Sequence, residues 1–281
     1  MNSSISAQTG FAHLTDLPCI LLQYGNATAV ISLYGGQVLS YRPAPDVDKL
    51  WLSPLAQWHN QTPIRGGVPV CWPWFGPADS RVNPKQNKLS NHGVVRTRMW
   101  QLVNQHTDDS QANATLEITV EDLPHHAGEV TLQLQVTLDS SLTINLCCNT
   151  SLLQQAALHS YFAITELAQT RVQPLPRQYS DKVTATTVAD ASEQAIFNAE
   201  VDRVYPQPVT NLQLLMPDSV VNLNQHGQDA TVVWNPWVER SRQITDLRDD
   251  SYLEFICVET ARLQLDKAAP LNLTQQIKAA T

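Results

Sequence analysis

The sequence predicts an all-β protein of antiparallel strands with few short helices, and three observations support this. Apolar and polar residues alternate through most of residues 130–149, as in a hairpin with one buried face. Short extended segments recur at intervals of about 8–12 residues, which is typical of sandwiches and barrels. Helical periodicity is scarce. The alternating apolar positions are Val130, Leu132, Leu134, Val136, Leu138, Leu142, Ile144, Leu146 and Cys148.

The remaining strands follow from the same pattern. Further strands are predicted at residues 20–22, 29–33, 38–41, 116–120, 212–216, 219–223, 231–234, 253–258, 262–265 and 271–277. Gly35 and Gly36 follow the strand at 29–33, and prolines at 43 and 45 end the strand at 38–41. A single helical turn is expected at 53–58 and a short helix at 189–199. Residues 81–90 are polar and aperiodic, which indicates an exposed loop.

The chain predicts one domain spanning residues 1–281. No stretch rich in Gly, Ser or charge separates two parts of the chain, and neither an internal repeat nor a low-complexity segment is evident. With 43% hydrophobic and 16% charged residues, the composition is that of a globular protein. No apolar run approaches the roughly 20 residues that cross a bilayer. The first fifteen residues do not resemble a secretory signal, so we expect a soluble, cytoplasmic protein.

Net charge and cysteine usage exclude several classes of function. A formal charge of −8 argues against general nucleic-acid binding, which needs a basic face. The five cysteines include no Cys-x-x-Cys pair, so neither a disulfide framework nor a zinc knuckle is expected. The eight histidines lack the helical spacing of a zinc protease. We therefore expect no metal, no cofactor and no membrane partner.

Residues 62–77, TPIRGGVPVCWPWFGP, form the most constrained stretch of the chain. Four prolines and three glycines lie within it, a mixture that no helix or central strand tolerates. We call it the signature loop. It carries the cation Arg65 and the aromatic residues Trp72, Trp74 and Phe75, which suit a flat polar ligand with negative charge. Alternatively, these aromatic side chains fill the core, as most aromatic residues do.

The signature loop resembles that of the D-hexose-6-phosphate mutarotases (glucose-6-phosphate 1-epimerases), which belong to the aldose 1-epimerase and galactose mutarotase-like superfamily. Four later segments resemble the family in the same order: NHGVVRTRMW from Asn91, ALHSYFAI from Ala157, DRVY from Asp202, and WNPWVERSRQITDL from Trp234 leading to FICVE at Glu259. Together the segments cover most of the chain. The resemblance implies the galactose-mutarotase-like β-supersandwich and an enzyme that interconverts sugar anomers.

Anomer exchange needs one base for the anomeric hydroxyl and one acid for the ring oxygen. His159 lies in an apolar, strand-like run, where a charged imidazole would be costly. A lone histidine there is also explained as a core residue bonded to a carbonyl. The resemblance to the family's L-H-x-Y-F segment implies that His159 is the acid that protonates the ring oxygen.

Glu259 ends the apolar run 255–258, so its carboxylate would be partly desolvated and its pKa raised. A strand-end glutamate that points into water is the alternative. The resemblance implies that Glu259 is the catalytic base. Thr260 and Ala261 follow where the family usually has proline and glycine, so a different turn is expected after the base.

The predicted substrate-binding residues are Arg65, Asn91, His92, Arg96 and Asp202. Arginine holds a phosphate dianion with a planar fork of donors, and the resemblance implies this role for the two arginines. Arg98 is an alternative for the second contact. The resemblance further implies that His92 and Asp202 contact the sugar. The alternative for Asp202 is a salt bridge to Arg203 or a turn cap. Trp234, Trp237 and Asp246 are interpreted as scaffold.

The sequence therefore predicts a cofactor-free isomerase acting on a small-molecule hexose 6-phosphate, with glucose 6-phosphate the expected substrate. A monomer is expected, and an oligomer remains open. One alternative is an aldose 1-epimerase for free sugars. Another is a non-catalytic carbohydrate-binding protein that uses Trp72 and Trp74 as a platform. A glycosidase needs two carboxylates flanking one bond, and only Glu259 lies in a motif.

Overall fold

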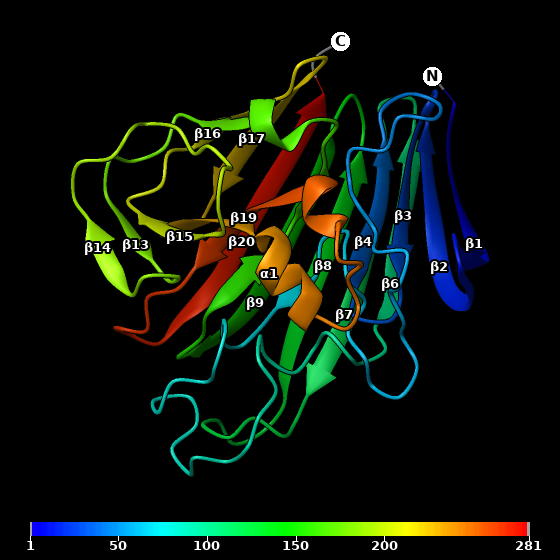
Figure 1. The fold of residues 1–281 in the computed structure, drawn as a ribbon. Coiled ribbons are helices and arrows are strands. Elements are labelled where there is room, and N and C mark those ends of the chain that lie inside the picture. Colours follow the sequence, from blue (N-terminus) through cyan, green and yellow to red (C-terminus); the bar gives the residue numbers. More distant parts are fainter. Residues whose placement is uncertain (1, 280–281) are drawn as a thin grey trace.

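The fold consists of three antiparallel β-sheets, seen in a computed structural model that describes residues 2–279 (Figure 1). The first sheet contains β1 (Ser3–Phe11), β2 (Leu14–Tyr24), β3 (Ala27–Ser32) and β4 (Gln37–Arg42). The second contains β5 (Val70–Cys71), β10 (Ala156–Leu158), β11 (Tyr161–Ala163), β13 (Tyr179–Asp181), β14 (Thr186–Val188), β15 (Val201–Pro206), β18 (Ala230–Asn235) and β19 (Phe255–Arg262).

The third sheet pairs strands from distant parts of the chain. It contains β6 (Gln101–Asp108), β7 (Gln111–Val120), β8 (Val130–Leu138), β9 (Leu142–Leu152), β12 (Arg171–Gln173), β16 (Asn211–Leu215), β17 (Val220–His226) and β20 (Ala269–Ala279). At its centre β20 lies between β9 and β17. The short helices within the described residues are η1 (Leu167–Gln169), α1 (Trp237–Gln243) and η2 (Ser251–Leu253). The all-β prediction is confirmed.

The hairpin of β8 and β9 confirms the strand prediction for residues 130–149. Along β8 every second side chain, from Val130 to Leu138, is buried, because successive side chains of a strand point to opposite faces. Asp139 stabilises the turn, since its Oδ1 accepts a hydrogen bond from the Ser141 N–H at 2.7 Å. The alternation in the sequence therefore identifies the face that lines the core.

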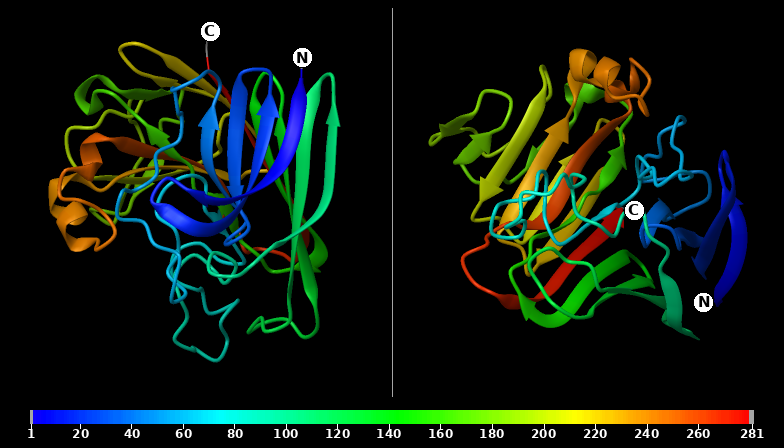
Figure 2. Two further views of the ribbon diagram at one scale, coloured as in Figure 1. Left: turned by 90° about the vertical axis from the view of Figure 1, so that its right-hand side faces the viewer. Right: turned by 90° about the horizontal axis from the view of Figure 1, so that it is seen from below.

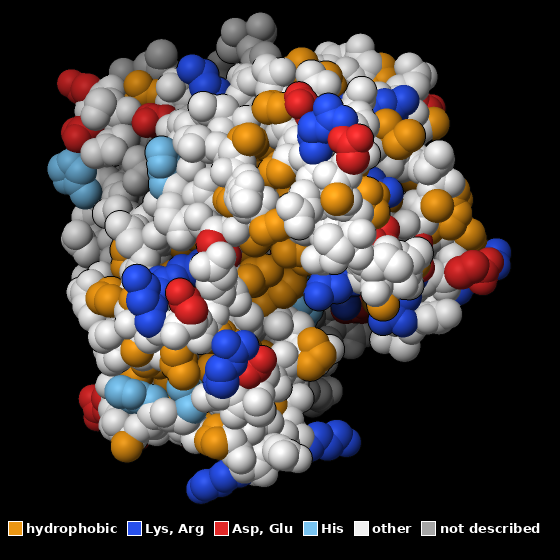
Figure 3. All heavy atoms as spheres, turned by 90° about the vertical axis from the view of Figure 1, so that its left-hand side faces the viewer, with side chains coloured by type: hydrophobic (Ala, Val, Ile, Leu, Met, Phe, Trp, Pro, Cys, Tyr) orange, Lys and Arg blue, Asp and Glu red, His pale blue; other side chains and the backbone are white. Residues whose placement is uncertain are grey.

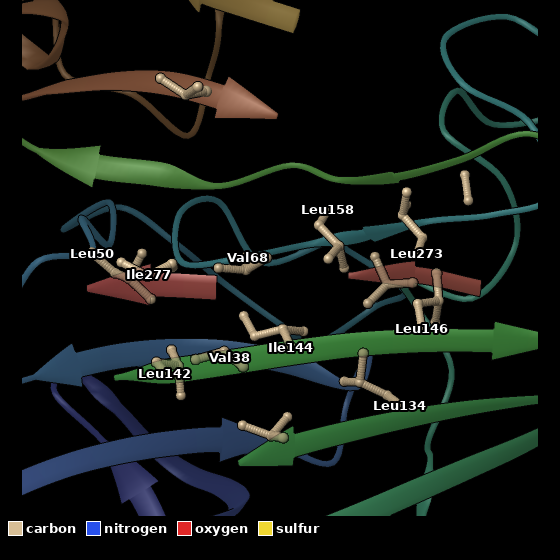
Figure 4. Packing of buried hydrophobic residues seen from close by; sticks show 14 of the residues in the cluster. Val38, Leu50, Val68, Leu134, Leu142, Ile144, Leu146, Leu158, Leu273 and Ile277 are labelled. Atoms are coloured by element: carbon tan, nitrogen blue, oxygen red, sulfur yellow. The ribbon is translucent and has the colours of Figure 1, made fainter. Parts of the chain in front are cut away.

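One continuous apolar cluster joins the three sheets. Figure 4 shows side chains from all three sheets in this cluster: Val38 of the first lies beside Leu142 and Ile144 of the third, and Leu158 belongs to the second. The first sheet also packs against β6 and β7 at one side of the molecule (Figure 2). On the face shown in Figure 3, cationic and anionic side chains are interspersed around hydrophobic ones. Among the described residues, no helix is long and apolar enough to cross a membrane.

The single turn predicted at 53–58 is present, whereas the short helix predicted at 189–199 is wrong. Residues 53–58 form one turn, in which the Ala56 N–H donates to the Ser53 carbonyl at 3.1 Å. The Ser53 hydroxyl donates a hydrogen bond to the Asp246 carbonyl oxygen. The Ser53 backbone N–H donates to the Arg65 carbonyl oxygen. Residues 189–199 are irregular, because their backbone groups bond across to Val172, Leu175 and Arg177 instead of along a helix.

The end of β19 also differs from the prediction. The strand was expected to end just before Glu259, with a turn after it and a separate strand at 262–265. Instead β19 continues to Arg262, because Thr260 and Ala261 pair with β10 on one side and β18 on the other. Glu259 therefore lies within a central strand rather than at its end.

Candidate active site

The predicted site residues line one cavity of about 650 Å³. Its floor is one face of the second sheet, on which Glu259, Val232 and Val204 lie side by side on β19, β18 and β15. Its walls come from the signature loop, from residues 90–96 and from α1. The predicted residues in the lining are Arg65, Asn91, His92, Arg96, His159, Asp202 and Glu259.

His159 lies opposite Glu259 because of strand register. Leu158 pairs with Thr260 and Tyr161 pairs with Cys257, which places residue 159 across from residue 259. Directly opposed residues of antiparallel strands project from the same face. The His159 Nε2 atom is 3.4 Å from the Glu259 Oε1 atom, and the two side chains are 9% and 1% exposed. The backbone N–H of His159 donates to the Pro69 carbonyl at 3.0 Å, so the signature loop helps to hold it.

Burial determines the protonation of this pair. Desolvation raises the pKa of Glu259 well above its ordinary value, and the Asp202 carboxylate raises it further while Arg96 opposes the shift. Desolvation likewise lowers the pKa of His159 well below its ordinary value, and His92 and Arg96 add to this effect. Burial therefore favours the uncharged form of both side chains.

Three buried polar atoms of the cavity residues have no hydrogen-bond partner among the described residues. They are the His159 Nδ1, Glu259 Oε2 and Arg96 Nε atoms. Buried polar groups are nearly always bonded, and an exception calls for an explanation such as a ligand. The arrangement therefore offers a carboxyl group, an imidazole and a guanidinium to a bound molecule.

The two predicted arginines have different surroundings. Arg65 donates from Nε to the Asp246 carboxylate at 3.0 Å and from Nη1 to the Tyr161 hydroxyl at 2.9 Å. Asp246, interpreted as scaffold, is thus the counter-ion of Arg65. Arg96 forms no ion pair among the described residues. Arg98 is held at the surface by Asp122 and does not line the cavity, so it is excluded as the alternative contact.

His92 and Asp202 flank the reacting pair. The Gly76 N–H donates to His92 Nδ1 at 3.3 Å, which leaves the ring proton on Nε2. Burial, with help from Arg96, lowers the pKa of His92 to about 3, so this ring is a neutral donor. Asp202 is not paired with Arg203, since adjacent residues of β15 face opposite ways and Arg203 contacts Asp181 instead.

The sequence predicts the positions of only some aromatic residues around the cavity. Trp72 and Trp74 are fully buried, and their indole N–H groups donate to Gln154 Oε1 and to the Ser90 carbonyl. The proposed Trp72 and Trp74 platform is therefore wrong, and the core-filling alternative holds for both. Phe75 does line the cavity, and so does Trp234, although its sequence segment indicates a scaffold role.

Further cavity residues were missed. Lys182, Glu200 and Arg240 add charged groups at the cavity lining. Strand pairing explains Trp234, which lies opposite Asp202 on β15 and so shares its face. No sequence signal identifies Lys182 or Arg240, because both depend on how a turn and a helix fold back over the sheet. Among the described residues, no cluster of three or more His, Cys, Asp or Glu side chains could hold a metal ion.

The chain is similar to known proteins in sequence and in fold. The family model described as aldose 1-epimerase matches residues 18–275. A protein of Escherichia coli K12 named "Putative glucose-6-phosphate 1-epimerase" is 32% identical over 95% of this chain and 92% of its own length. A Salmonella typhimurium protein of the same name is 31% identical over 94% and 91%.

Solved structures share the fold. That of a Salmonella typhimurium "putative mutarotase" superposes with a TM-score of 0.88 at 28% identity, over 99% of this chain and 97% of the other. That of a galactose 1-epimerase from Lactobacillus acidophilus superposes with a TM-score of 0.74 at 14% identity, over 99% and 98%. The second likeness concerns the fold alone.

Proposed function

This chain belongs to the aldose 1-epimerase family, and from that premise we propose that it interconverts the α and β anomers of a hexose 6-phosphate. Glucose 6-phosphate is the expected substrate, as the names of the relatives suggest. The observation that carries the proposal is the His159 and Glu259 contact, 3.4 Å long, at the floor of a cavity with unpartnered polar atoms.

Glu259 acts as the base and His159 as the acid during ring opening. Glu259 takes the proton of the anomeric hydroxyl while His159 delivers a proton to the ring oxygen, so the C1–O5 bond breaks and C1 becomes an aldehyde carbon. Rotation about C1–C2 and the reverse transfers close the ring as the other anomer. No atom is gained or lost, and the pair returns to its initial state.

Ring opening begins once the proton that the pair shares has passed from Glu259 to His159, because Glu259 is a base only as a carboxylate and His159 an acid only as an imidazolium. The pair begins this half-reaction as a carboxylate and an imidazolium and ends it as two neutral groups. Because burial raises the pKa of Glu259 and lowers that of His159, the neutral state is the more stable one. The pair carries one proton in total, and the short contact between Nε2 and Oε1 allows this proton to pass between the two residues.

Local cations support a phosphate-bearing substrate. The chain has a net charge of −8, yet Arg65, Arg96, Lys182 and Arg240 all line this cavity. Asp246 offsets the charge of Arg65, whereas Arg96 is buried and has an unpartnered Nε. We therefore assign the main phosphate contact to Arg96. Arg65 orients the sugar while it is held by Tyr161 and Asp246.

The test is anomer exchange measured by NMR with glucose 6-phosphate, glucose and galactose as parallel substrates. Acceleration above the buffer rate for glucose 6-phosphate, with little for the free sugars, is expected. Equal acceleration of free and phosphorylated sugars would replace the phosphate assignment with an aldose 1-epimerase of broad specificity. Exchange at the buffer rate for all three sugars would contradict the proposal.

A further inference from the structure

Five fully buried polar side chains form a chain of hydrogen bonds through the apolar core, on the side of the second sheet that faces away from the cavity. Ser160, Thr231 and Thr260 belong to the active-site sheet and its connections. Gln225 of β17 and Gln275 of β20 reach them from the third sheet. We call these residues the inter-sheet network.

The network is continuous. Gln275 Oε1 accepts a hydrogen bond from the Ser160 hydroxyl, and Gln275 Nε2 donates to Thr260 Oγ1 at 2.9 Å and to the Val258 carbonyl at 3.2 Å. The Thr260 hydroxyl donates to Gln225 Oε1 at 2.8 Å, and Gln225 Nε2 donates to Thr231 Oγ1 at 3.0 Å. Each glutamine side chain thus accepts a hydrogen bond at Oε1 and donates from Nε2.

The network lies directly behind the reacting pair. Ser160 follows His159 and Thr260 follows Glu259, so the side chains of each neighbouring pair project from opposite faces of the sheet. The contacts matter most at His159, because β10 ends at Leu158 and β11 begins at Tyr161. In that interruption Gln275 binds the Ser160 side chain, and the Ser160 carbonyl accepts from the Val258 N–H at 3.2 Å.

Stability alone does not explain such a network. Replacing both partners of a buried hydrogen bond with apolar groups of the same shape is often nearly neutral, so an apolar core would serve the fold as well. Reacting groups, by contrast, must be held within a fraction of an ångström, and a displacement of 1 Å costs up to about a hundredfold in rate. The network links the backbone next to His159 and Glu259 to the third sheet.

We propose that Gln275 and Gln225 are positioning residues that act through Ser160 and Thr260 to keep His159 and Glu259 in register. The inference rests on the proposed function of the pair. It concerns the residues behind the sheet, which touch neither the cavity nor a substrate.

The test compares Gln275→Met, Thr260→Val and Thr260→Ser with Leu273→Val. Leu273 is a buried neighbour of Gln275 on the same face of β20, outside the network, so its variant controls for loss of core stability. We expect Gln275→Met and Thr260→Val to lower kcat about tenfold with KM within about twofold. Thr260→Ser keeps the hydroxyl and should retain kcat, as should Leu273→Val.

A second readout does not depend on catalysis. In protein labelled with ¹⁵N-histidine, the ring signals of His159, identified by their loss in His159→Asn, should shift in Gln275→Met and Thr260→Val but not in Leu273→Val. Unchanged ring signals and unchanged kcat in a folded Gln275→Met or Thr260→Val protein would overturn the inference. If the wild type exchanges no anomers, the proposed function fails, and the ring signals still decide the positioning role.

Discussion

His159 and Glu259 face each other across neighbouring antiparallel strands, with Nε2 3.4 Å from Oε1. One hundred residues of sequence separate them, and the register of β19 brings them together. Because both side chains are buried, desolvation raises the pKa of Glu259 and lowers that of His159.

Removing either reacting group should abolish most of the activity. Glu259→Gln and His159→Asn are each expected to lower kcat for glucose 6-phosphate by roughly 10²–10⁴-fold, which is the usual contribution of general acid or base catalysis. NMR exchange rates measure this effect. Glu117→Gln and His226→Asn make the same chemical changes outside the cavity and should keep wild-type rates. A variant of the pair with wild-type kcat would refute its assigned role.

Glu259→Gln and His159→Asn should change the pH dependence of the free energy of unfolding in opposite directions. Glu259 binds its proton more tightly when folded, so its contribution to the free energy of unfolding falls as pH rises above 4.5. His159 binds its proton less tightly when folded, so its contribution rises with pH up to 6.5. Each slope is limited to about 1.4 kcal/mol per pH unit.

In the wild type these slopes oppose each other between pH 4.5 and 6.5. Glu259→Gln should therefore become more stable relative to wild type as pH rises through this range, and His159→Asn less stable. Urea denaturation at half-unit intervals of pH measures both. Parallel stability curves for the three proteins would show that burial does not shift these two pKa values.

Arg96 should discriminate phosphorylated from free sugar. Arg96→Met removes a charged donor with an unpartnered Nε, so kcat/KM for glucose 6-phosphate is expected to fall by about ten- to a hundredfold. The rate at which the protein exchanges the anomers of free glucose should change by less than about twofold in Arg96→Met. Arg98→Met is the matched control, because Arg98 is paired with Asp122 away from the cavity. Equal losses for both sugars would indicate a structural role for Arg96.

Gly93 should tolerate no side chain. Its φ is 84°, and a Cβ there would lie 1.8 Å from the Trp72 carbonyl oxygen, where the two segments form a parallel bridge. Gly76 also has positive φ, at 65°, but nothing lies within 4 Å of the corresponding Cβ.

Gly76→Ala should therefore cost only about 1–2 kcal/mol of unfolding free energy for the left-handed backbone. Gly93→Ala should cost roughly 3 kcal/mol or more, because backbone must also move. Urea denaturation measures the free energy of unfolding of both variants. Equal decreases would mean that the backbone of the signature loop at Trp72 moves at little cost.

Trp234 should report ligand binding. It lines the cavity, whereas Trp72, Trp74 and Trp100 are buried elsewhere in the core. Titration with glucose 6-phosphate should change the tryptophan fluorescence of the wild type and of Trp58→Phe, and the change should be lost in Trp234→Phe. A signal that persists in Trp234→Phe would mean that the sugar does not reach the floor of the cavity.

Much of this protein was determined by local sequence alone. Alternation along residues 130–149 identifies the buried face of a strand, because side chains of a strand alternate strictly whatever it pairs with. The motif residues His159, Glu259 and Arg96 could also be selected from sequence, since each belongs to a segment that resembles the family. Sequence reasoning failed at residues 189–199, where hydrogen bonds to distant segments replace those of the predicted helix.

Tertiary structure alone decided how these residues meet. Strand pairing places Glu259 opposite His159 and Trp234 opposite Asp202, and it buries Trp72 and Trp74 while leaving Phe75 in the cavity. It also joins Gln275 to Ser160 across the core. A strand's own pattern states which side chains share a face, but it contains no information about the partner strand. That choice is made by packing between residues far apart in the chain, and the active site depends on it.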